Sequence, residues 1–137
     1  MSYSHYITMF FIMILSGFLT TMNIWTDKLN DIRLSLNDVY MVLLMAGWMV
    51  LFMGLFYGEL YPGLFGFILV SLCLFAIRTQ FMINKKQFIL GMIPHHSMAV
   101  FMSKKLIENE KIGNFQNFVK NIIVQQEKEI EFMKTLV

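Results

Sequence analysis

The sequence predicts an all-α membrane protein, in which three transmembrane helices precede an amphipathic, antiparallel helical hairpin. Hydrophobic residues make up 57% of the 137 residues and charged residues only 15%, whereas a soluble domain carries about a quarter charged residues. The charges are also segregated along the chain. Three long stretches contain no charged side chain: Tyr6–Trp25, Val39–Gly58 and Leu60–Ile77.

Each uncharged stretch has about the 20 residues that a helix needs to cross a bilayer core. We expect the first to be a mature span and not a signal peptide, because no basic region precedes it and no small-x-small cleavage site follows. The link from Gly58 to Gly63 is so short that the second and third spans must pack antiparallel. The single cysteine, Cys73, lies within the third span, so no internal disulfide can form.

Basic residues in the short connections predict the orientation. Lys28 and Arg33 lie in the first loop, and Arg78, Lys85 and Lys86 follow the third span, whereas the N-terminal lead and the second loop hold none. Because cytoplasmic connections carry an excess of Lys and Arg, we expect the N-terminus outside and the C-terminal hairpin inside. The predicted division is a membrane region at 1–83 and a hairpin at 84–137.

The hairpin is predicted from a change of pattern after the third span. The segment Gln87–Asn109 is typical of an amphipathic helix, interrupted or kinked near Gly91 and Pro94 because proline lacks a backbone donor. A turn is expected at 108–114, and Phe115–Val137 forms the second helix. Two amphipathic helices with a short link make an antiparallel αα-hairpin.

Two groups of side chains on the hairpin could carry chemistry. His95, Met98 or Ala99, and Met102 share one helical face, and Gln126, Glu129 and Met133 have the same spacing on the second helix. Folding the chain at the turn sets the histidine pair opposite Glu129 and Met133. Imidazole with thioether is a soft ligand set that favours copper, above all Cu(I). The alternative is that the methionines only fill the core and the His pair is simply exposed.

A second methionine pattern lies within the membrane region. Met41, Met45, Met49 and Met53 recur at every fourth position of the second span and therefore form a single stripe. The stripe could pass Cu(I) across the bilayer, or it could be a flexible packing surface.

Several function classes are excluded. A di-iron bundle needs two Glu-x-x-His pairs and a zinc hydrolase typically His-Glu-x-x-His, and neither motif occurs. A membrane haem would need facing histidines, but only His5 lies near a span. We find no nucleophile–base pair or cofactor fingerprint, so we expect no enzyme. The formal charge of +2 without a basic stripe argues against nucleic acid.

The motifs of the hairpin resemble a known family. Met92-Ile93-Pro94-His95-His96-Ser97-Met98-Ala99, followed by Ile122-Ile123-x-Gln125-Gln126-x-x-Glu129-Ile130-x-x-Met133, is similar to the domain of unknown function 305, a ferritin-like helical-hairpin family. The resemblance extends to a membrane-bound branch with three N-terminal spans, through Ser2-Tyr3-x-His5-Tyr6 and Ile77-Arg78-Thr79-Gln80.

The resemblance implies copper binding, because some exported members of the family are regarded as copper-binding proteins that use His and Met ligands. Carried over to this chain, it nominates a set of ligands with two supporting residues. The set is His95, His96, Met98, Met102 and Met133, supported by Gln126 and Glu129.

A structural or assembly role is the alternative function. Phe88, Leu106, Phe115, Phe118 and Ile122 give the hairpin an apolar stripe that two helices alone cannot hide from water. We therefore expect the hairpin to dock on the bilayer, on further copies in a homo-oligomer, or on a protein partner.

Overall fold

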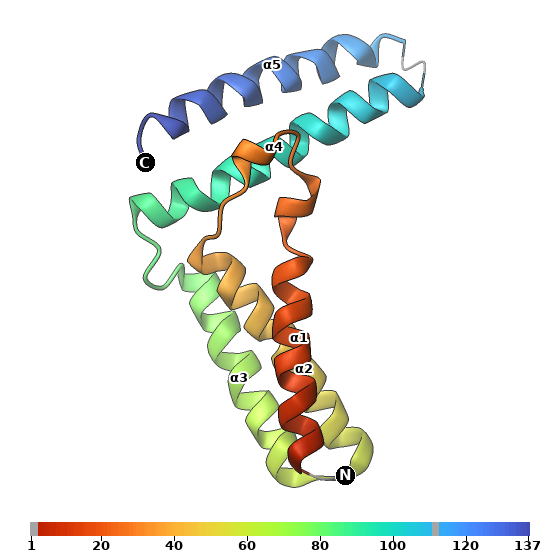
Figure 1. The fold of residues 1–137 in the computed structure, drawn as a ribbon, viewed down its shortest axis with the longest axis vertical. Coiled ribbons are helices and arrows are strands. Elements are labelled where there is room, and N and C mark those ends of the chain that lie inside the picture. The colour runs from red at the N-terminus through yellow and green to blue at the C-terminus, as the bar shows by residue number, and fades with distance from the viewer. Residues whose placement is uncertain (1–2, 111–112) are drawn as a thin grey trace. The chain divides into compact units, whose positions relative to one another are not determined.

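A computed structural model describes residues 3–110 and 113–137, and within these ranges the chain is helical without strands (Figure 1). Two short 3₁₀ helices, η1 (Met22–Trp25) and η2 (Leu29–Asp31), lie between the first two α-helices. The α-helices are α1 (Tyr3–Leu19), α2 (Leu36–Tyr57), α3 (Leu60–Thr79), α4 (Lys85–Asn109) and α5 (Phe115–Lys134).

The chain divides into two compact units. The membrane unit consists of Met1–Thr21 and Leu36–Ile83, and the hairpin unit consists of Met22–Ser35 and Asn84–Val137. The loop between α1 and α2 thus belongs with the hairpin, which the sequence pattern did not indicate.

Three helical segments are long and apolar enough to cross a membrane: Ser4–Trp25, Leu36–Tyr57 and Leu60–Thr79. They overlap the three uncharged stretches, so the sequence-based prediction of three such helices is confirmed. The first α-helix is shorter than predicted, because it ends at Leu19 and the chain continues as η1. The Thr20 hydroxyl donates to the carbonyl of Ser16 at 2.9 Å, and such side-chain bonds compete with the helical ladder.

Glycines allow α2 and α3 to pack as close antiparallel neighbours. A Cβ on Gly54 would overlap the backbone of Gly63, and a Cβ on Gly66 would overlap that of Leu51. The turn between the helices needs Gly58, whose φ of +67° is a left-handed conformation that a side chain disfavours. On the other side of α2, Gly17 of α1 lies against Val42.

In the hairpin unit, α4 begins after Asn84, whose side chain accepts a hydrogen bond from the Gln87 N–H at 3.0 Å. Of the two alternatives expected near Gly91 and Pro94, the interruption is wrong, because α4 runs through both residues; the kink stays a prediction. Proline removes one N–H, and its ring crowds the carbonyl four positions earlier, yet the helix continues and the Pro94 ring is buried within the unit.

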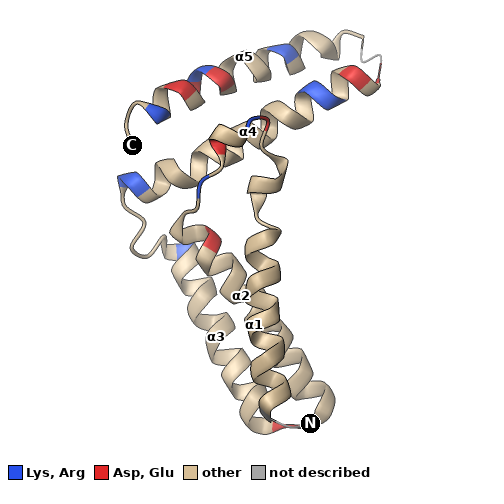
Figure 2. Ribbon diagram, viewed as in Figure 1, with Lys and Arg blue, Asp and Glu red and all other residues tan. Residues whose placement is uncertain are grey.

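The two hairpin helices are antiparallel, as predicted, and enclose a small apolar core. Ile89, Ile93 and Val100 of α4 meet Ile130 and Met133 of α5 in one buried cluster. The second helix ends at Lys134, three residues earlier than predicted. The predicted turn at 108–114 includes residues 111–112, which lie outside the described residues. Charges gather on α4, α5 and the loop, whereas α1, α2 and α3 are uncharged along most of their lengths (Figure 2).

Candidate metal centre

The His-His segment lies in the middle of α4, where successive side chains point in directions about 100° apart. His95 is exposed, His96 is half-buried, and Ser97 is fully buried with 0% exposure. Ile93 and Pro94 before the pair are also buried. The pair therefore lies at the edge of the packed face of α4, with one imidazole in solvent and the other turned toward α5.

His96 faces Glu129 of α5, as the sequence-based pairing predicted. Its Nδ1 lies 3.2 Å from Oε2 of Glu129, although within the described residues this nitrogen makes no aligned hydrogen bond. The other carboxylate oxygen of Glu129 accepts a hydrogen bond from the Gln125 amide at 2.6 Å. Glu129 is therefore held in place by its own helix.

Burial lowers the pKa of His96 below its ordinary value; the negative charge of Glu129 opposes the shift, and His95 adds to it. Neutral imidazole is therefore the favoured form of His96 at neutral pH. A metal ion binds the neutral ring through a nitrogen lone pair. The environment thus keeps His96 in the form that a metal requires.

The two imidazoles of the pair are near each other. Their ring centroids are 5.9 Å apart and the ring planes are inclined by 55°. The thioether of Met98, three residues after His95, belongs to the same helix and is half-buried. His95 and Met98 are one helical turn apart, so both can approach one ion from α4.

The structure does not gather all seven nominated residues at one point. Met133 lies in the buried core of the hairpin. Met102 is 52% exposed and lines an apolar groove together with Ile122. Gln126 has a buried side-chain oxygen that meets no donor among the described residues.

Carboxylates and imidazoles alone do not form a metal site here. Within residues 3–110 and 113–137, no group of three or more His, Cys, Asp and Glu side chains is arranged to hold a metal ion. A site at the His-His segment therefore needs sulfur ligands from methionine, or a ligand from outside the chain.

A network of buried polar groups adjoins the His-His segment, and sequence reasoning missed it. The Ser97 hydroxyl donates to Oδ2 of Asp31 at 2.6 Å and accepts from the Asp27 N–H at 2.9 Å. Asp31 is 2% exposed, and its Oδ1 forms an ion pair with Lys134 at 2.7 Å. The Ser97 side chain therefore connects α4 to the loop, and Lys134 connects the loop to α5.

A second ion-pair group binds the same three segments. The Lys104 ammonium of α4 lies 2.8 Å from Asp27 of the loop and 3.0 Å from Glu127 of α5. The hydrogen bond to Asp27 is the main cause that raises the pKa of Lys104. Glu127 therefore pairs across the hairpin with Lys104.

Residues 79–137, which contain all of α4 and α5, match the family described as a domain of unknown function, DUF305. The chain is also 40% identical to an uncharacterized protein of Acanthamoeba polyphaga mimivirus over 129 residues, which cover 88% of this chain and 83% of the relative. No solved structure matches the chain. The aligned region is longer than the hairpin, so the likeness to the viral protein extends into the membrane unit. The chain thus belongs to the family of the domain of unknown function DUF305, whose characteristic segment here is the helical hairpin.

Proposed function

We propose that the protein is a small, non-catalytic membrane protein that binds Cu(I) at the His95–His96 segment of its hairpin. The observation that carries the proposal is the arrangement of the two imidazoles. An imidazole nitrogen binds a metal at about 2 Å, so two rings that share one ion have their centres roughly 6 Å apart. The rings of His95 and His96 are 5.9 Å apart.

The donor set of α4 fits a soft cation. His95, His96 and Met98 supply two imidazoles and a thioether within one helical turn, and soft ligands of this kind favour Cu(I). Met102 is a further thioether on the exposed side of the helix. Nδ1 of His96 lies 3.2 Å from Glu129, so Nε2 is the nitrogen that would bind the ion. Bound Cu(I) would be held for storage or transfer without any reaction on the protein.

The test is a Cu(I) titration of the full chain in detergent, with a chromophoric Cu(I) chelator as competitor. We expect about one Cu(I) per chain, and its loss in the double variant His95→Ala with His96→Ala. The matched control is His5→Ala, which removes the remaining histidine and should leave binding unchanged. Equal stoichiometry in the double variant and the control would refute the proposal.

An assembly role is the second candidate function, and an apolar groove on the hairpin unit favours it. The groove has a volume of about 620 Å³ and lies between Trp25 of the loop, Phe101 and Leu106 of α4, and Phe115 and Ile122 of α5. Ferritin-like bundles bury such faces among four helices, whereas this hairpin contributes two. A second copy of the hairpin is therefore the partner that we propose for the groove.

Mass measurement of the full chain in native-like lipid discs tests this role. A homo-oligomer is expected for the unaltered chain, and Leu106→Glu should shift it to monomer because a charge would be buried at the contact. Lys128→Glu, at an exposed position of α5 outside the groove, is the control that should not shift it. A monomeric unaltered chain would contradict the assembly role and leave the copper proposal intact.

A further inference from the structure

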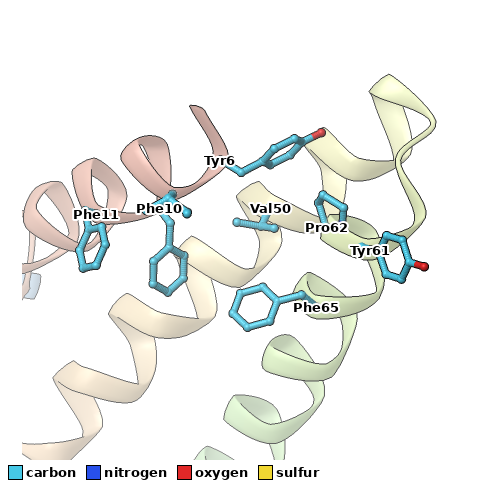
Figure 3. A pocket seen from close by; sticks show the side chains of 8 residues that line it. Tyr6, Phe10, Phe11, Val50, Tyr61, Pro62 and Phe65 are labelled. Atoms are coloured by element: carbon cyan, nitrogen blue, oxygen red, sulfur yellow. The ribbon is translucent and has the colours of Figure 1, made fainter. Parts of the chain in front are cut away.

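The membrane unit contains an apolar groove of about 350 Å³ that the proposed metal centre does not involve. Tyr6 and Phe10 of α1 form one wall, Tyr61, Pro62 and Phe65 of α3 form the other, and Val50 of α2 lies at the floor (Figure 3). The rings of Phe10 and Phe65 meet edge to face across it, with centroids 6.1 Å apart. The groove is thus enclosed on three sides by the three helices.

The packing of the glycines explains why the groove exists. α2 and α3 are in close contact, because Gly54 and Gly66 let their backbones meet. The C-terminal end of α1 packs on α2, where Gly17 lies against Val42 and Met45. Toward its N-terminal end, α1 carries Tyr6, Phe10 and Phe11, whose side chains line the groove. The result is an aromatic-walled space between α1 and α3.

The depth of the groove in the membrane follows from its place along the helices. Tyr6 lies in the first turn of α1, and Tyr61 and Pro62 lie in the first turn of α3. Both first turns lie at one end of the unit, beside the α2–α3 turn (Figure 1). Tyrosines are enriched where a bilayer's hydrocarbon meets its headgroups. The groove therefore begins at that interface and extends toward the hydrocarbon at Phe10 and Phe65.

We infer that this groove is a binding site for one membrane phospholipid, with the upper part of an acyl chain lying along the touching rings of Phe10 and Phe65. The walls are apolar, which suits an alkyl chain, and the phenol groups of Tyr6 and Tyr61 lie at the level of the ester groups. A flexible chain can fill a concave, irregular space, whereas a second copy of the chain would need a matching ridge. The lipid is thus retained by contacts with three helices at once, unlike a lipid on the convex faces.

Photolabelling in lipid discs tests the site. The full chain is reconstituted in phosphatidylcholine that includes a small fraction carrying a diazirine on the acyl chain near the ester. After irradiation, we expect labelled peptides to concentrate at residues 6–11 and 61–65, several-fold above the other lipid-exposed faces of α1–α3. Labelling spread evenly over these faces would overturn the inference.

A matched pair of variants adds specificity. Ile7→Trp places an indole at the mouth of the groove, at a position that is 58% exposed and lines it. Ile68→Trp makes the same change at a 49% exposed position of α3 outside the groove. We expect the first to lower labelling at 61–65 several-fold and the second to leave it unchanged. Equal effects of the two variants would overturn the inference.

Native mass spectrometry gives an independent readout. The unaltered chain should retain about one phospholipid after purification in mild detergent, and Ile7→Trp should retain less than Ile68→Trp. Two outcomes would assign the groove to another occupant and reject the phospholipid. One is displacement of the photolabel by cholesterol but not by excess phosphatidylcholine. The other is a dimer in which residues 6–11 and 61–65 are protected from the label.

Discussion

Ser97 is the residue at which the candidate metal centre meets the rest of the hairpin unit. It follows His96 directly, and its buried hydroxyl donates to Asp31 and accepts from the Asp27 N–H. A buried donor or acceptor that loses its partner is strongly unfavourable. One hydroxyl group next to the His pair therefore makes two of the contacts that hold the loop on α4.

The first prediction is that Ser97→Ala destabilises the hairpin unit by about 1–3 kcal/mol, because it leaves the Asp27 N–H and one oxygen of Asp31 unpaired. Thermal unfolding followed by Trp25 fluorescence measures the loss, since Trp25 packs on Phe101 with ring centroids 6.5 Å apart. Trp48→Phe serves as the background, because it removes the other tryptophan.

Ser103→Ala is the control for this prediction, since it deletes a half-buried hydroxyl further along α4. We expect it to change stability by a few tenths of a kcal/mol at most. An equal loss of stability in Ser97→Ala and Ser103→Ala would contradict the prediction, because the hydrogen bonds of Ser97 to the loop would then add no stability.

The second prediction concerns the ion pair of Lys134 and its pH dependence. The hydrogen bond to Asp31 is the main cause that raises the pKa of Lys134 above its ordinary value of 10.5. A raised pKa of a lysine means that the folded state binds its proton more tightly than the unfolded state does. The stabilisation is therefore complete below pH 10.5 and is lost as the pH rises through the higher folded-state pKa.

Lys134→Met should destabilise the hairpin unit at neutral pH, by less than the roughly 3–5 kcal/mol of a fully buried pair, because Lys134 keeps 18% of its side chain exposed. The difference in free energy of unfolding between Lys134→Met and the unaltered chain should shrink as the pH is raised above 10.5. Chemical unfolding at several alkaline pH values measures it. A difference in free energy of unfolding that stays constant well above pH 10.5 would contradict the stabilising role of the Lys134–Asp31 ion pair.

At the scale of elements, the sequence predicts the helices well and their connections poorly. The spans follow from local hydropathy, and α4 and α5 follow from amphipathic periodicity, so both signals lie within about 20 neighbouring residues. The contact of His96 with Glu129 also follows from folding one hairpin. Ser97 and Asp31 are 66 positions apart, and Lys104 and Asp27 are 77 apart. No periodicity in the sequence connects such pairs, so the docking of the loop on α4 could not be predicted.

Pro94 illustrates the limit of a local rule. Proline alone predicts an interrupted helix, but α4 continues because its remaining backbone bonds and the buried contacts of Pro94 outweigh one missing donor. In the same way, the spacing of Met133 fitted a ligand, yet the structure places its thioether in the core beside Ile130. The spacing of residues shows which of them share a helical face. Tertiary packing decides which of these residues lie at the site and which lie in the core.

The third prediction concerns the contact of α2 with α3. Gly54→Ala should destabilise the membrane unit by about 1–3 kcal/mol, because its Cβ would overlap the backbone of Gly63 and force the helices apart. Gly63→Ala is the matched control, since a Cβ there would meet its nearest neighbours at an ordinary 3.9 Å. Unfolding by titration with a denaturing detergent compares the two. A larger loss in Gly63→Ala than in Gly54→Ala would contradict the described helix contact.

At the scale of the whole molecule, contacts within the hairpin unit restrict the membrane topology. The loop at residues 22–35 connects α1 to α2, and it packs on α4 through Ser97 and Lys104. α4 follows α3 directly. A loop and a hairpin that touch lie on the same side of a membrane, so α2 and α3, both long and apolar enough to span one, are expected to cross and return as a pair. The opposite side then holds the α2–α3 turn.

The fourth prediction is that single cysteines at Leu29 and Asn117 react with a membrane-impermeant maleimide from the same side, and a cysteine at Leu60 reacts from the other. All three positions are exposed, and Cys73→Ala gives a background without cysteine. By the excess of Lys and Arg in the connections, cysteines at Leu29 and Asn117 should react only after the cells are permeabilised, and a cysteine at Leu60 should react without it.

The shared side of Leu29 and Asn117 and the orientation of the whole chain are tested separately. Labelling of Leu29 and Asn117 from opposite sides would contradict the packing of the loop on α4, whereas reversal of all three positions would contradict only the orientation taken from the basic residues. In the second case the proposed Cu(I) site would face the outside of the cell, with the same ligands.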